Sequence, residues 1–364
     1  MAYQNVKTPR FYIDYLQWHQ AVGLLGSTHF IRNSDIHTPT DPHNAVSNVI
    51  GLNPTSQTFL NWGGSGDAGF NFQIDLKESF PVDKINVVGI FGHNLSGHEL
   101  TGDNSGFSFQ YLDSNGNFPY IKLTDEFIIN GDRNENSINN ISLDGFTLCS
   151  ANGSTSVTFP VSDDVGAGLQ PNIRGVTDPE YQFKFGSLLM GRYYKMPHSP
   201  DLSLTLTHDY SGIKTMETIG GASLSNARWS KPSKWGDREA WQLGDFPYYY
   251  SGRRIWDLSF SYISDTDIEP YSYYGNKYDS DTGDSPTESE GSDNWFQNVL
   301  FYTNGGQLAF IFNPDSSIEY LAPDDGSPPR VPEFAICKLD MNSFSRKQVA
   351  NNVYNIKVKV REVW

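Results

Sequence analysis

The sequence is short of cysteine, and this shortage excludes two classes of stabilised fold. Its 364 residues contain two cysteines, Cys149 and Cys337, which lie far apart and form no CxxC pair. Such a spacing supports neither a zinc ribbon nor a disulfide framework. Both cysteines have apolar neighbours, so we expect two buried, inert thiols.

Long apolar runs and an excess of positive charge are missing as well. No apolar run approaches the roughly 20 residues that span a bilayer, and the N-terminus shows no signal peptide. The 26 basic and 42 acidic side chains give a net charge of −16, which excludes a broad electrostatic grip on nucleic acid or on an anionic membrane surface. We therefore expect a soluble product made in a cytoplasm.

The motifs of the common enzyme classes are also absent. The eight histidines form neither an HExxH nor an HxH pattern, and no GxSxG, P-loop or GxGxxG motif occurs. Asp279, Asp281 and Asp284 are spaced so that they could collect oxygen ligands for calcium, but the closing glutamate of a calcium loop is missing, which favours a solvated acidic loop. The sequence predicts a protein that is not an enzyme and holds no metal or cofactor.

Helical periodicity is scarce, and alternation of apolar and polar residues is the dominant pattern. Aromatic residues make up 14% of the chain, which is typical of a folded protein. Residues 107–112 and 120–123, joined by a turn with Asn115-Gly116, predict a hairpin. This density of strands predicts an all-β fold of two or more β-sandwich domains. Further strands are expected at residues 70–76, 84–89, 156–159, 181–189, 202–207, 255–263, 307–312, 334–339 and 353–360, and short helices at 12–22 and 294–303.

Two polar segments differ in composition from the rest of the chain. Residues 130–140 are rich in Asn and Asp and predict a long exposed loop. Residues 265–293 hold nine acidic residues and one lysine, mixed with Ser, Thr, Gly and Tyr. That composition buries little apolar surface, so we expect a mobile acidic loop at 265–293.

The central part of the chain carries a pattern of strands that resembles a known module. An aromatic-rich strand ends in Asp75-Leu76, an Ile85-x-x-Val88 strand follows, and the hairpin comes next. This order resembles the discoidin-like, or galactose-binding-like, jelly roll, which we place at 40–184 and expect to be separable from the rest. The resemblance implies glycan binding through loops, with Trp62, His93, Asn94 and His98 as the candidate surface. The alternative is that Trp62 is a core residue and the histidines lie on a solvated rim.

The C-terminal half has a different character. Its features are GRRIWDLSF at 252–260, TNGGQLAFIF at 303–312 and the alternating end NVYNIKVKVREVW at 352–364. Together they resemble tail proteins of tailed bacteriophages, with the distal tail, or tail hub, protein as the nearest type. We assign residues 185–364 to a tail-protein-like β domain that the N-terminal segment 1–39 joins.

The resemblance implies a structural virion protein: a ring component at the hub or baseplate, self-associating as a hexamer and contacting other phage tail proteins. Candidate assembly residues are Arg253, Trp256, Tyr354 and Trp364. The terminal strand can lie at a subunit edge, or it can close its own sandwich. An alternative function is a virion surface protein that binds a host-surface glycan or receptor through the discoidin-like module. A third possibility, an accessory region of a secreted carbohydrate-active enzyme, is disfavoured by the missing signal peptide and catalytic pair.

Overall fold

The structure is a computed structural model, and it describes part of the chain. Side chains are described for residues 6–25, 49–53, 186–209, 215–224, 253–269, 294–316 and 334–363, and for Val87, Gly89 and Phe91. A second set of residues is described by its backbone alone. These are 30–32, 58–61, 68–76, 88, 90, 106–111, 120–121, 141–143, 146–150, 167–176, 182–185, 225, 234–235 and 238–239.

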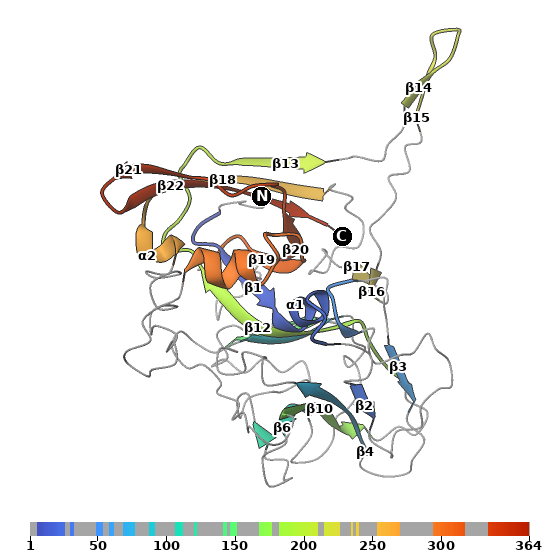
Figure 1. The fold of residues 1–364 in the computed structure, drawn as a ribbon. Coiled ribbons are helices and arrows are strands. Elements are labelled where there is room, and N and C mark those ends of the chain that lie inside the picture. Colours follow the sequence, from blue (N-terminus) through green and yellow to red (C-terminus); the bar gives the residue numbers. More distant parts are fainter. Residues whose placement is uncertain are drawn as a thin grey trace, which may run out of the picture.

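The main feature is one antiparallel sheet that curls around the centre of the molecule (Figure 1). Its strand order is β13-β18-β22-β20-β19-β1-β12-β5-β9-β8, and β21 pairs with β22 beside this path. The strands are β1 (Arg10–Asp14), β5 (Val87–Phe91), β8 (Ile141–Leu143), β9 (Phe146–Ser150), β12 (Ser187–Lys195), β13 (Thr205–Asp209), β18 (Arg253–Ser264), β19 (Phe310–Asn313), β20 (Ala335–Leu339), β21 (Arg346–Ala350) and β22 (Val353–Glu362).

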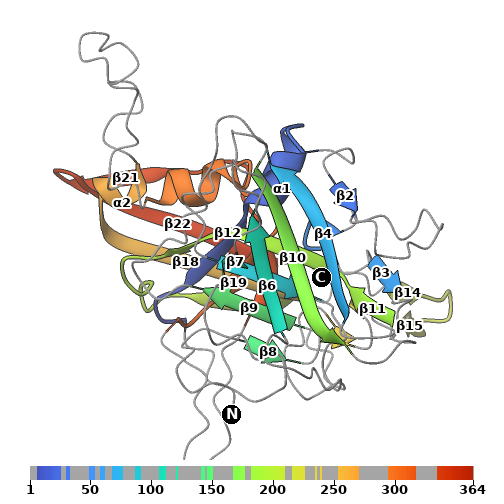
Figure 2. The same cartoon turned by 90° about the horizontal axis from the view of Figure 1, so that it is seen from below.

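A second antiparallel sheet has the order β2-β4-β10-β6-β7. It lies below β12 in Figure 1, and Figure 2 shows it in front of β9 and β12. The remaining strands form three separate pairs. The strands of the second sheet and of these pairs are β2 (Phe30–Arg32), β4 (Ala68–Leu76), β6 (Gly106–Tyr111), β7 (Tyr120–Ile121), β10 (Ala167–Val176), β3 (Thr58–Asn61) with β11 (Gln182–Phe185), β14 (Thr215–Glu217) with β15 (Ser223–Ser225), and β16 (Lys234–Trp235) with β17 (Arg238–Glu239).

The described residues are mostly β-strand, as the alternation predicts. The division into sandwiches and the discoidin-like topology stay predictions. The predicted hairpin is confirmed, because β6 pairs with β7 and Phe109 lies opposite Ile121. The strands expected at 255–263, 334–339 and 353–360 correspond to β18, β20 and β22. The strand expected at 202–207 begins later, at Thr205, and Leu202 is fully exposed.

The prediction of a helix at residues 12–22 was wrong for residues 12–14. Residues Arg10–Asp14 are the strand β1, and the helix α1 covers only Tyr15–Ala21. Asp14 marks the change, because its Oδ1 accepts the backbone N–H of Leu16 at 3.0 Å and caps the helix. The second expected helix is confirmed as η5 (Phe296–Phe301), which has π-helical hydrogen bonding.

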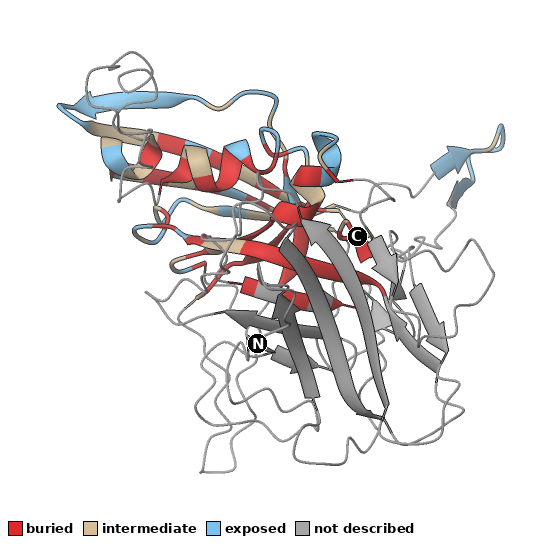
Figure 3. Ribbon diagram, turned by 60° about the horizontal axis from the view of Figure 1, so that its bottom comes forward, coloured by how far each residue is buried: buried red, intermediate tan, exposed pale blue. Residues whose placement is uncertain are grey.

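The main core lies inside the curled sheet, and Figure 3 shows buried residues in red. Phe11 of β1 is at its centre, where its ring lies 5.0 Å from the ring of Trp295 and 5.2 Å from that of Phe312. Neighbouring Tyr12 points to a second cluster on the other face of the sheet, with Phe334 at 5.9 Å. Strand β1 is therefore buried on both faces.

The main sheet crosses the boundary that we expect at residue 184. Strand β5 lies in the expected central module, yet it pairs with β12, with Ile90 opposite Leu188. The second core cluster crosses the same boundary, because it joins Val87 and Phe91 to Leu189. This pairing differs from the expectation of a separable module, whose strands would not borrow partners from the C-terminal half.

Parts of the two polar segments can also be compared with expectation. Within 265–293, the first residues form the short helix α2 (Asp265–Ile268), and Ile268 is fully buried in the main core. The acidic segment is thus anchored at its start. Residues 270–293 and 130–140 lie outside the described residues, as does the strand expected at 156–159.

Candidate assembly surface on strands β18 and β22

The surface proposed for assembly is built on two long neighbouring strands. Strands β18 and β22 pair so that Trp256 faces Val360 and Leu258 faces Val358. Because side chains of a strand alternate between faces, these residues point into the core and the intervening ones point outward. Their burial follows that alternation along both strands.

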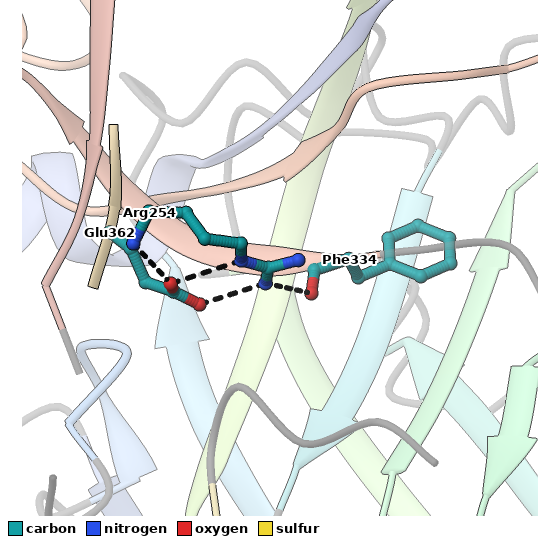
Figure 4. Close-up of polar contacts among 3 residues, drawn as sticks. All are labelled: Arg254, Phe334 and Glu362. Carbon is teal, nitrogen blue, oxygen red and sulfur yellow. Dashed lines mark hydrogen bonds and ion pairs between the residues drawn. The ribbon is translucent and has the colours of Figure 1, made fainter. Parts of the chain in front are cut away.

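A buried ion pair joins the two strands near the end of the chain (Figure 4). The Arg254 guanidinium donates to both carboxylate oxygens of Glu362, from Nη2 at 2.9 Å and from Nε at 3.1 Å. The backbone N–H of Arg254 donates to the same carboxylate at 2.9 Å, and Nη2 reaches the carbonyl oxygen of Phe334 at 3.5 Å. This bidentate geometry is the strong form of an arginine–carboxylate contact.

The surroundings of Arg254 keep it charged. Burial by itself lowers the pKa of the guanidinium, but the charge and hydrogen bonds of Glu362 outweigh burial and raise that pKa above its ordinary value. The guanidinium carbon also lies 5.0 Å from the centre of the Trp256 ring, as in a cation–π contact. The pair therefore places two charged groups inside the fold, in contact across β18 and β22.

Cys337 lies on β20, opposite Glu362 in the strand register. It is fully buried and free. Burial raises the pKa of its thiol well above the usual value, and the charge of Glu362 raises it further. The expectation of a buried thiol is confirmed here, and the high pKa keeps it unreactive. The side chain of Cys149 lies outside the described residues.

The outward face of β22 is basic, although the whole chain is acidic. Lys357 is exposed, Lys359 reaches Asp340 at 2.9 Å, and Arg361 reaches Asp209 at 2.7 Å. Exposed ion pairs of this kind add little stability. The basic residues of β22 are therefore interleaved with acidic ones, since Asp257 also lies opposite Lys359, and Lys357 is the exposed member of the row without an ion pair in the described part of the chain.

Tyr262 interrupts the regular pairing of β18. Its backbone φ is +63°, which is unusual for a bulky residue, and the register shifts between Phe260 and Ile263. The side-chain oxygen of Asn355 accepts the Tyr262 backbone N–H at 3.1 Å and holds this β-bulge, so the tyrosine ring is exposed. The alternation in the sequence gives no sign of the bulge.

Three of the four candidate assembly residues lie within the described part of the chain, and the structure spreads these three along β18 and β22. Arg253 is half-buried at the start of β18, opposite Asp209. Trp256 is buried, with its ring 5.0 Å from that of Phe312, so it supports the strand from inside. Tyr354 is half-buried at the far end of β22, beneath the guanidinium of Arg346. Trp364 lies outside the described residues.

The candidate glycan-binding residues cannot be placed in the same way. Trp62, His93, Asn94 and His98 all lie outside the described residues, and so do Asp279, Asp281 and Asp284. Glycan binding by the central module stays a prediction. Within the described ranges, no three His, Cys, Asp or Glu side chains gather where they could hold a metal ion.

Comparison with known proteins identifies no relative. No protein-family model matches this chain, and neither a curated protein nor a solved structure matches it. None of the helices in the described part has the length and the apolar character that crossing a membrane requires.

Proposed function

We propose that this chain is a structural virion protein that forms an oligomeric ring at the distal end of a bacteriophage tail. The sequence motif at 252–260, on which the resemblance to tail proteins rests, forms most of strand β18. This strand and its neighbour β22 supply a long surface with one bulge at Tyr262, and the buried Arg254–Glu362 pair joins the two strands. Each identical subunit would present the same surface to its neighbour.

The observation that carries the proposal is the outward face of β22, where exposed Lys357 stands beside Lys359 and Arg361, which are paired with Asp340 and Asp209. Copies of a chain with net charge −16 repel one another, and contact requires a surface that offsets this repulsion. Lys357 is exposed and can meet acidic surface of the next copy, whereas Lys359 and Arg361 would have to exchange or share their partners Asp340 and Asp209. Complementary faces on two different sides of one subunit give a ring when the rotation between neighbours closes, as we propose here.

Light scattering coupled to size-exclusion chromatography tests the proposal at micromolar concentration. We expect a mass near that of six chains for the purified protein, or six copies in the ring of purified particles. The mass of the purified protein should fall as added salt screens the charged contact. Lys357→Glu should weaken association, and Lys195→Glu is the matched control, because Lys195 is exposed at the end of β12. A strict monomer both alone and in the particle contradicts the proposed function.

A further inference from the structure

The β14–β15 hairpin exposes apolar side chains on one face. Met216 lies directly opposite Leu224 across the hairpin, so the two side chains share a face, while Glu217 and Ser223 share the other. Met216 is 68% exposed, Leu224 is 54% exposed, and Ile219 at the turn is fully exposed. An element with one polar and one apolar face normally covers the apolar face.

The turn of this hairpin is held by its own hydrogen bonds. The backbone N–H of Thr218 donates to the carbonyl of Ala222 at 2.9 Å, and the N–H of Ala222 donates to the hydroxyl of Thr218 at 3.0 Å. Gly221, at a φ of +80°, allows the tight reversal. In the described part of the chain, β14 and β15 pair only with each other. A lone two-stranded hairpin is marginally stable in water, and a contact on its apolar face would stabilise it.

A second apolar surface lies on the body, where α1 meets η5. Val22 follows α1 one turn after Trp18, so both lie on the same side of the helix end. The Trp18 ring contacts the Phe301 ring at 5.2 Å. Val22 and Phe301 are each 43% exposed. We call Trp18, Val22 and Phe301 the α1–η5 patch.

The hairpin and the α1–η5 patch lie apart within one molecule. Figures 1 and 2 both place β14 and β15 at the periphery, away from α1. Both surfaces are also poor in charge, because Glu217 is the only Asp, Glu, Lys or Arg in 215–225, and residues 15–25 and 294–306 contain none. On a chain of net charge −16, such surfaces are where two copies approach with least repulsion, and interface centres are depleted of charge.

We propose that the β14–β15 hairpin of one copy packs Met216, Ile219 and Leu224 onto the α1–η5 patch of the neighbouring copy. The proposal rests on the self-association in the proposed function and names a contact within it. Because donor and acceptor are different surfaces, the interface is heterologous, and each copy gives one hairpin and receives another. This arrangement forms a ring when the rotation from one copy to the next closes.

The small size of the two surfaces favours a ring of identical copies over a binary complex with another protein. A stable pair of proteins buries about 1,600 Å², which is several times what three aliphatic side chains cover. The same contact repeated around a closed ring acts together with the charged contact of β22, so each one is made at a high effective concentration.

Three single variants and one cross-linking experiment test the contact. Ile219→Asp and Val22→Lys place a charge in the contact, and both side chains are exposed in the single copy, so folding should be unaffected. We expect self-association to weaken at least about tenfold in each, as measured by sedimentation velocity. Leu202→Asp is the matched control, because Leu202 is fully exposed and lies outside both surfaces, and it should associate as the unchanged chain does.

Cross-linking shows whether the two surfaces meet between copies. A chain with Ile219→Cys is mixed with a tagged chain carrying Val22→Cys and is then oxidised; the unchanged chains give the background from Cys149 and Cys337. A disulfide between tagged and untagged chains supports the proposal. Normal rings formed by the Ile219→Asp variant overturn the proposed contact. So do rings of the two cysteine variants that give no cross-link above background. Either result leaves the proposed function standing. If the unchanged chain is a monomer alone and in particles, both fail.

Discussion

Arg254 and Glu362 form a buried ion pair, so removing either partner leaves the other as an unpaired charge inside the fold. Arg254→Met leaves the Glu362 carboxylate inside the fold without its partner, and we expect the free energy of unfolding to fall by about 3–5 kcal/mol. Urea denaturation measures the loss. The double variant Arg254→Met with Glu362→Leu removes both charges and should recover most of it.

A surface pair on the same strand is the control for this prediction. Arg361→Met removes the partly exposed contact with Asp209 and should change the free energy of unfolding by no more than about 1 kcal/mol. If the double variant is as unstable as Arg254→Met alone, the packing of the side chains, and not the unpaired charge, accounts for the loss.

Asp14 makes the stability of the fold depend on pH. Burial raises the pKa of its carboxyl to about 7, although the backbone N–H groups of Met190, Leu16 and Gln17 oppose the rise. The folded state then holds a proton that the unfolded state releases near pH 4, so stability decreases as pH rises from about 4 to about 7. The total loss is about 4 kcal/mol.

Asp14→Asn should remove this pH dependence. The amide keeps an oxygen that can accept from Leu16 and Met190, and it carries no charge at any pH. We expect the variant to be more stable than the unchanged chain above pH 7 and equal to it near pH 4, as measured by urea denaturation across that range. Asp257→Asn, at an exposed position of β18, should keep the slope. An unchanged slope in Asp14→Asn would show that other groups cause it.

At the level of elements, the sequence predicted the strands that have one buried face and one solvent-exposed face. Strands β18 and β22 follow their alternating patterns because the core covers only one side of each. Strand β1 was mistaken for helix because Phe11, Tyr12 and Ile13 are all buried, which removes the alternation. Its partners β12 and β19 are far away in sequence, and no local pattern encodes that pairing.

The candidate assembly surface on β18 and β22 was predictable from the sequence only in part. The basic alternation of β22 is visible in the sequence, whereas the partner of Arg254 comes from a strand 108 residues later and the bulge at Tyr262 depends on Asn355. The exposed hairpin β14–β15 was missed because its strands have only three residues each. Strands that short give no periodicity to read.

Strands β1 and β12 approach each other so closely that one position between them requires glycine. A Cβ atom on Gly191 would lie 1.9 Å from the carbonyl oxygen of Ile13, and backbone cannot move aside as a flexible side chain can. We expect Gly191→Ala to lower the free energy of unfolding by about 3 kcal/mol or more, with a matching fall in Tm. Gly220→Ala in the exposed hairpin turn is the control, since its Cβ would meet only the Thr218 hydroxyl at 3.9 Å. A Tm unchanged by Gly191→Ala would show that β1 and β12 lie further apart.

At the scale of the whole molecule, the main sheet joins strands from the N-terminal, central and C-terminal segments of the described chain. Strand β12 has β1 on one side and β5 on the other, so it joins the N-terminal segment to the central module. The second core cluster continues this connection, because Val87 and Phe91 pack with Ile311 and Phe334 from the C-terminal half. The central segment therefore shares strand pairing and core with the rest of the chain at β5.

This continuity predicts the behaviour of residues 40–184 expressed alone. The fragment retains β5 but lacks β12, so one edge of β5 loses its hydrogen bonds and the buried side chains of Val87 and Phe91 lose their cover. We expect the fragment to aggregate or to bind a hydrophobic dye without a cooperative thermal transition. In the full chain, the amides of β5 should exchange with deuterium as slowly as those of β12, because both belong to one cooperative sheet. A monomeric fragment with a sharp melting transition, or fast exchange in β5 beside slow exchange in β12, would show that the central module folds on its own.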